Sequence, residues 1–217
     1  MKIRLVRVMA FLAGTAALTA LVPLGCRTVL GIEPLGSDTL TCDLYCDTIA
    51  SACTGATLQY ASRDACMGLC ATFPVGTLQD NGVDTLGCRL SLAMAISNTG
   101  EGSCAGAGPG GAGDCGTDYA SFCASAVQVC PTDFKDVTDC AALTAPSIVP
   151  ECGTYSVTLG GTLPDVNSIQ CRLYHLTAAT LDPVTHCPHV LGLGLCRVDG
   201  PQCDGSDGGT TDGGDGG

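Results

Sequence analysis

The sequence contains no tryptophan and only four phenylalanines and five tyrosines among its 217 residues. Large aromatic side chains supply much of the apolar area that ordinary cores bury, so this chain has to gain rigidity in another way. Its 17 cysteines provide one, because a disulfide typically contributes about 2–4 kcal/mol of stability. So many cysteines indicate an oxidising compartment. A reduced zinc protein is disfavoured, since the chain has no C-x-x-C pair.

Basic residues are also scarce, with 9 lysines and arginines against 21 acidic residues and a formal net charge of −12. Three of the basic residues, Lys2, Arg4 and Arg7, stand at the very start of the chain. Nucleic acid phosphates need lysine and arginine partners, so nucleic acid is excluded as a partner. Electrostatic docking on an anionic membrane surface is disfavoured for the same reason.

Familiar catalytic motifs are missing as well. The chain has no G-x-S-x-G elbow, no H-E-x-x-H, no P-loop, no C-x-x-C-H haem motif and no G-x-G-x-x-G before a predicted helix. The glycine-rich stretch 106–113 contains no lysine and lies between two cysteines, which disfavours phosphate binding. No pair of carboxylates stands out. An enzyme of unrecognised class remains an alternative.

The first 25 residues have the layout of a secretory signal peptide. The three basic residues precede an uncharged apolar run from Val8 to Val22, and small residues follow. We therefore predict a signal peptide over residues 1–25. The uncharged run is near the lower length limit for a membrane span, so an uncleaved anchor is the alternative.

The segment Pro23-Leu24-Gly25-Cys26 resembles a bacterial lipobox, although Pro23 stands where leucine is usual. Removing Cys26 from the count leaves sixteen cysteines, an even number that can all pair. We therefore predict lipid attachment at Cys26 and a tether over residues 26–41. The expected location is the cell envelope, as an outer-membrane lipoprotein whose lipid contacts the membrane. A secreted or periplasmic protein cut at an ordinary site is the alternative.

The rest of the chain contains one cysteine pattern twice. Repeat one (residues 42–115) and repeat two (residues 116–203) share a C-x6-C spacing, at Cys53 and at Cys130. They share a Cys-Arg-Leu triplet, starting at Cys88 and at Cys171, and an interval of sixteen from that cysteine to the next. Agreement in all three features indicates an internal duplication.

The spacing of the cysteines predicts helices. Cys42, Cys46, Ile49 and Cys53 fall on one helical face. Thr41 and Thr117 are expected N-caps of the two equivalent helices, and Gly55 and Pro131 should stop them. We predict a mainly α fold of two tandem disulfide-stapled modules, each a helical hairpin with a third helix and a Cys-closed loop. Residues 204–217 contain only Gly, Asp, Ser and Thr and are expected to form a disordered tail.

Differences between the repeats suggest how the cysteines pair. Cys42 and Cys70 are absent together from repeat two, where Tyr119 and Thr144 align with them, so they should be partners. Cys46–Cys66 and Cys123–Cys140 then follow as rungs of the hairpins. By analogy and elimination we predict the remaining pairs, Cys53–Cys88, Cys104–Cys115, Cys130–Cys171, Cys187–Cys196 and Cys152–Cys203.

The three histidines of the chain, His175, His186 and His189, all lie in repeat two. As a set they could bind zinc or copper, while the alternative is a structural role with no cofactor. The repeated Arg89 and Arg172 are expected to form structural ion pairs or to cap carbonyl groups. A shared contact with a ligand is the alternative.

The stretch from Cys171 to His189, with Cys-Arg-x-Tyr-His followed by His-Cys-Pro-His, resembles a motif of uncharacterised Cys-rich bacterial lipoproteins. The resemblance implies an exported location and a stapled fold, and it implies no activity. Together with the missing catalytic motifs it favours a structural or binding protein of the cell envelope with a protein or glycan partner. A metal-binding envelope protein is the second hypothesis.

Overall fold

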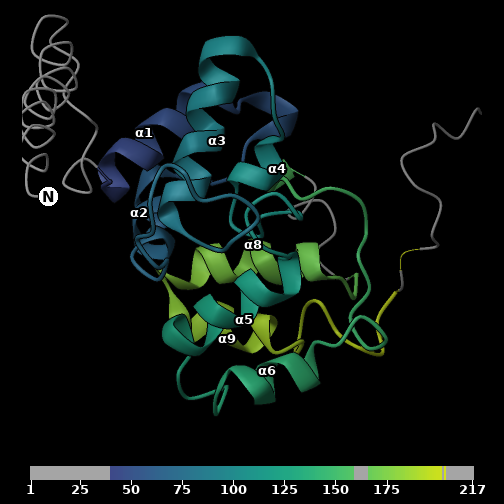
Figure 1. Ribbon diagram of the computed structural model, residues 1–217. Coiled ribbons are helices and arrows are strands. Elements are labelled where there is room, and N and C mark those ends of the chain that lie inside the picture. The colour runs from purple at the N-terminus through teal and green to yellow at the C-terminus, as the bar shows by residue number, and fades with distance from the viewer. Residues whose placement is uncertain (1–39, 159–165, 202, 204–217) are drawn as a thin grey trace, which may run out of the picture. The chain divides into compact units, whose positions relative to one another are not determined.

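The computed structural model describes residues 40–158, 166–201 and 203, and Figure 1 shows how they are arranged. The described residues are mainly helical, contain no β-strand and belong to one compact unit, Ser37–Gly217. The predicted signal peptide, Cys26, the tether up to residue 39 and the tail 204–217 lie outside the described residues. None of the helices described is both long enough and apolar enough to cross a membrane.

Repeat one consists of short helices. They are α1 (Cys42–Ala52), the 3-10 turn η2 (Gly55–Thr57), α2 (Arg63–Cys70), α3 (Leu86–Thr99) and α4 (Cys104–Ala107). Helix α1 packs against α2, α3 and α4, and α4 also packs against α3. The predicted hairpin and third helix are therefore present, and the predicted Cys-closed loop contains a fourth, very short helix.

Repeat two has the same arrangement. It consists of α5 (Asp118–Val129), α6 (Val137–Leu143), α8 (Ile169–Ala179) and α9 (Pro183–Val190). Helix α5 packs against α6, α8 and α9, and α9 packs against α8. These contacts correspond one for one with those of α1 to α4, so the two repeats share their packing as well as their cysteine spacing.

Polar N-cap residues explain where the helices begin. Side chains of Thr41 and Thr117 accept hydrogen bonds from the first turns of α1 and α5, as expected from the sequence. Further caps are Ser62, Thr85 and Ser103 in repeat one and Asp136, Ser168 and Asp182 in repeat two. Each cap satisfies one backbone N–H that the helix itself leaves without a partner, a contribution of about 1 kcal/mol.

Sixteen cysteines pair in eight disulfides. Four of these disulfides are the pairs predicted from the sequence: Cys42–Cys70, Cys46–Cys66, Cys123–Cys140 and Cys152–Cys203. The first two form two rungs across the α1–α2 hairpin, and the third is the single rung between α5 and α6.

The other four predicted pairs are wrong, and the error is the same in both repeats. In place of Cys53–Cys88 and Cys104–Cys115, the structure has Cys53–Cys104 and Cys88–Cys115. In place of Cys130–Cys171 and Cys187–Cys196, it has Cys130–Cys187 and Cys171–Cys196. The disulfide topology is therefore duplicated together with the helices.

The length of α3 explains the correction. Cys88 lies in the first turn of α3, whereas Cys104 follows its C-terminal end, and a helix of 14 residues spans roughly 21 Å at 1.5 Å per residue. Cys53 lies at the C-terminal end of α1, with its Cα 5.7 Å from that of Cys104. A disulfide requires such a short Cα–Cα distance, so Cys53 cannot also reach the opposite end of α3.

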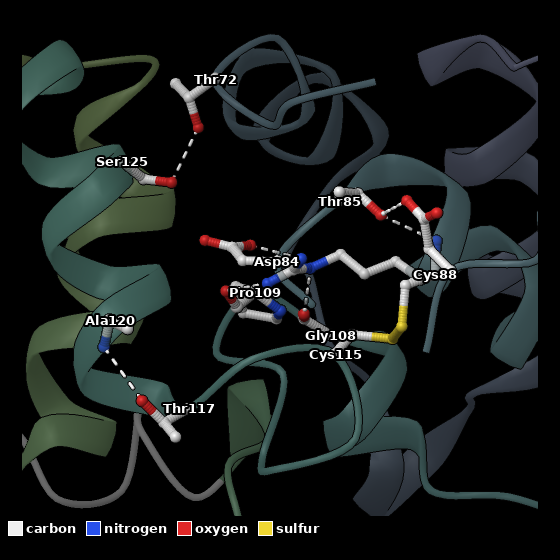
Figure 2. A network of polar contacts seen from close by, with 12 residues as sticks. Thr72, Asp84, Thr85, Cys88, Gly108, Pro109, Cys115, Thr117, Ala120 and Ser125 are labelled. Atoms are coloured by element: carbon white, nitrogen blue, oxygen red, sulfur yellow. Dashed lines mark hydrogen bonds and ion pairs between the residues drawn. A yellow bond between two sulfur atoms is a disulfide. The ribbon is translucent and has the colours of Figure 1, made fainter. Parts of the chain in front are cut away.

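The repeats pack directly against each other. In Figure 1, α8 lies between repeat one and the helices α5 and α9 of its own repeat, and it contacts α2, α5 and α9. Gly68 allows this approach, because a Cβ atom there would lie 2.6 Å from the Cβ of Thr180. The hydroxyl groups of Thr72 and Ser125 share a hydrogen bond of 2.7 Å across the same boundary (Figure 2).

Candidate histidine site

Helices α8 and α9 bring the three histidines together. His175 lies on α8, and His186 and His189 lie three residues apart on α9. The ring centroid of His175 is 5.2 Å from that of His186 and 4.7 Å from that of His189. We call these three residues the histidine cluster. The turn between α8 and α9 therefore brings together the side chains of His175 and His186, which are eleven residues apart in the sequence.

His175 and His186 are the two members of the cluster whose rings form a hydrogen bond with each other. Their Nδ1 atoms are 3.0 Å apart, which is the distance of a hydrogen bond between a protonated and an unprotonated nitrogen. His175 is only 4% exposed. Its Nε2 is buried and has no hydrogen-bond partner among the described residues. No backbone carbonyl or carboxylate of the described residues thus fixes the ring of His175, as one usually does for a structural histidine.

His189 is held differently. The backbone N–H of Leu195 donates a hydrogen bond of 3.0 Å to Nδ1 of His189. The lone pair of this nitrogen is therefore already used, and the proton of the neutral ring lies on Nε2. The ring centroids of His186 and His189 are 6.2 Å apart. His189 is thus next to the pair and is not part of it.

Burial keeps the pair uncharged. Desolvation, with smaller contributions from His189 and His186, lowers the pKa of His175 to about 4. Desolvation also lowers the pKa of His186, and the nearby His189 adds to this effect, while Asp182 opposes it. Both rings are consequently neutral near pH 7, which is the form of imidazole that ligates metal ions.

Cysteines surround the cluster without being available as ligands. Among the described residues, ligating atoms of three residues lie within 4.8 Å of one another in two groups, Cys171–His175–Cys196 and Cys130–Asp133–Cys187. In each group the two cysteines are joined to each other in a disulfide. A metal at the cluster would therefore be held by imidazole nitrogens.

The two repeated arginines lie elsewhere and serve the fold. Arg89 is fully buried and donates to the carbonyl groups of Gly108 and Pro109 at 3.0 and 3.2 Å. It also forms an ion pair of 2.6 Å with Asp84 and stacks over the ring of Phe73 at 4.2 Å. Figure 2 shows Asp84, Gly108 and Pro109 gathered beside the Cys88–Cys115 disulfide.

Arg172 repeats this role with fewer partners. It is 1% exposed and donates to the carbonyl groups of Val190 and Cys196 at 3.1 and 3.4 Å. No carboxylate among the described residues pairs with it, and burial lowers its pKa to about 10. In both repeats, the arginine thus holds the loop that the neighbouring disulfide closes. Carbonyl capping and ion pairing are the two structural roles expected from the sequence, and Arg89 makes both interactions.

Asp84, the ionic partner of Arg89, is not among the residues predicted from the sequence. The available signal was its position five residues before the arginine of the triplet. Asn167 holds that position in repeat two and donates to the carbonyl of Ile148. Because this residue is neutral, the spacing of a carboxylate five residues before the arginine occurs in only one repeat.

Part of this chain is similar to a known protein family. Residues 37–119 match the model of the BfoA family C-terminal domain. The searches of curated proteins and of solved structures found no match. The matched range covers the whole of repeat one and ends in the first turn of α5. The similarity to the BfoA family C-terminal domain therefore falls on the repeat that lacks the histidine cluster.

Proposed function

We propose that this chain is an exported, lipid-anchored protein of the bacterial cell envelope that works by binding a partner. The observation that carries the proposal is the complete pairing of sixteen cysteines in eight disulfides. Cys26 is the one cysteine of the sequence left over, and it directly follows the lipobox-like segment. Lipid attachment gives this odd cysteine a role that an exported protein can use.

The paired cysteines also support export itself. Disulfides at this density form and persist in oxidising compartments such as the periplasm or the cell surface. The basic start and apolar run of the first 25 residues provide the corresponding signal.

The rigidity of the folded body supports a binding role. Its buried arginines hold loops in place, and disulfides attach those loops to α3 and α8. A rigid surface of this kind loses little conformational freedom when a partner binds. We propose an envelope protein or a glycan as that partner.

Metabolic labelling with a palmitate analogue tests the anchor. The wild-type chain should incorporate label in the bacterium, and Cys26→Ala should not. The double variant Cys152→Ala/Cys203→Ala is the matched control, because it removes two exported cysteines and should remain labelled. Absence of label from the wild type would refute the lipid anchor and leave export intact.

Photo-crosslinking in the living cell tests the binding role. A crosslinking amino acid at the exposed Val184, which is 86% accessible, or at the exposed Val75 samples one surface of each repeat. One envelope protein or glycan should be captured repeatedly from at least one position. If neither position captures a partner and the purified body turns over substrate in a hydrolase screen, an enzymatic function replaces the binding role.

A further inference from the structure

We propose that the Nδ1 atoms of His175 and His186 bind one divalent transition-metal ion, zinc or copper, and that His189 is not a ligand. This site goes beyond the envelope role proposed above and does not depend on it. It differs from the three-histidine site considered in the sequence analysis, because it is a two-histidine chelate formed between α8 and α9.

The distance between the two nitrogens carries the inference. Zinc–imidazole bonds are about 2.0–2.1 Å long, so two nitrogens on one ion lie roughly 2.8–3.4 Å apart at bond angles between about 90° and 110°. The Nδ1 atoms of His175 and His186 are 3.0 Å apart, within this range. The two side chains, one from α8 and one from α9, therefore already place both nitrogens at chelating distance.

The surroundings of His175 provide a second, independent observation. The side chain is buried, yet its only hydrogen-bond partner among the described residues is the other histidine. Repeat one has Leu92 at the equivalent position and folds with the same helix packing and disulfides. The fold thus has no need of an imidazole there.

The hydrogen bond to His189 excludes it from the chelate. Because Leu195 N–H occupies Nδ1 of His189, the proton of this ring cannot move there to free Nε2 for a metal ion. In the His175–His186 pair, the one proton between the two Nδ1 atoms can move to the Nε2 of its own ring, which frees both Nδ1 lone pairs for the ion. The remaining coordination positions of the ion are left to water or to a ligand from outside. Imidazole suits both zinc and copper, and copper binds such sites more tightly.

Calorimetric titration with zinc and with copper tests the site in the full chain, purified without an affinity tag, treated with a chelator and kept non-reduced. We expect one ion per chain with a Kd below about 10 μM. His186→Ser, the repeat-one residue at that position, should weaken binding at least tenfold. His189→Asn is the matched control, because its side-chain oxygen still accepts from Leu195 N–H, and its Kd should stay within threefold of the wild type.

Histidine ¹⁵N spectra locate the ligands without a substitution. On saturation with zinc, the Nδ1 resonances of His175 and His186 should shift while that of His189 keeps its position. Three results would each overturn the proposal: a wild-type Kd above about 10 μM for both ions, equal loss of affinity in His189→Asn and His186→Ser, or unchanged affinity in His186→Ser. The second result would indicate a three-histidine site, and the third would place the ion at carboxylates elsewhere.

Discussion

Arg89 and Arg172 show how a single residue of the duplicated motif organises each repeat. Each is buried beside a disulfide, and each donates to two carbonyl groups of the loop that the disulfide attaches to α3 or α8. The difference lies in the counter-charge, since Asp84 neutralises Arg89 and Arg172 has no such partner among the described residues. A buried guanidinium without a carboxylate is costly unless its donors are satisfied.

Asp84→Asn should destabilise the protein by about 1–3 kcal/mol, because it leaves the buried charge of Arg89 without its carboxylate. The substitution copies the residue that repeat two has at this position. Urea unfolding measures the change in the free energy of unfolding. Glu101→Gln, at an exposed position outside the helices and without an ion pair among the described residues, is the control and should change this free energy by less than about 0.5 kcal/mol. A similarly small effect of Asp84→Asn would show that the carbonyl groups alone satisfy Arg89.

The histidine cluster predicts a pH-dependent stability of the metal-free protein. The pKa of His175 is about 4 in the folded state and near 6.5 when unfolded, so the unfolded chain binds more protons between these values. Its contribution is fully present above pH 6.5 and is lost as the pH falls toward 4. The groups facing it are His186 and His189 from α9, with Tyr174 beside it on α8.

The loss amounts to ~3 kcal/mol across this window. Urea unfolding with a chelator, at several pH values between 7 and 4, measures it. His175→Leu copies repeat one and should remove most of this slope while leaving the contribution of the carboxylates. An equally steep decline in His175→Leu would contradict the assigned pKa.

At the scale of helices, the sequence predicted the hairpin and the third helix of each repeat and missed the helices α4 and α9, which lie in the segments expected to be loops. The N-caps Thr41 and Thr117 and the periodic apolar faces specify α1 and α5 locally. Helix α4 has only four residues, and α9 contains Pro188. Such helices form because packing and disulfides hold them, and a propensity or periodicity pattern does not reveal this.

Some of the disulfides could likewise be predicted from the sequence, and others could not. Joint absence of Cys42 and Cys70 from repeat two identified that pair, and hence the hairpin rungs. Cys53, Cys88, Cys104 and Cys115 are all kept in repeat two, so no loss distinguishes one pairing from the other. Only the spatial direction of α3 decides that Cys53 meets Cys104.

The duplicated architecture predicts that repeat one tolerates the loss of its extra rung. The double variant Cys42→Tyr/Cys70→Thr installs the residues of repeat two. It should unfold with a free energy lower by about 3–4 kcal/mol in the chain-entropy estimate for a loop of 28 residues. Its helicity, followed by circular dichroism, should match the wild type. Loss of helical signal at 25 °C would show that this rung is required for folding.

For the whole molecule, the mainly helical stapled fold and the candidate residues could be predicted from the sequence, but the geometry of those residues could not. The distance between His175 and His186 depends on how α9 packs on α8, and the cysteine that attaches α9 to α5 was assigned to another partner. The duplication distinguishes the residues of the scaffold from those of the candidate site. Shared cysteines and arginines build the scaffold, and the unshared histidines form the candidate site.

We propose that sixteen cysteines form disulfides and that the seventeenth, Cys26, carries a lipid. Intact-mass spectrometry of the protein taken from bacterial membranes tests both parts of this proposal in one measurement. The denatured chain is treated with an alkylating reagent before and after reduction. We expect an N-terminal Cys26 carrying the mass of a lipid, no alkylation before reduction and sixteen additions after it. Alkylation of any cysteine before reduction, or a mature chain without lipid, would contradict the proposal.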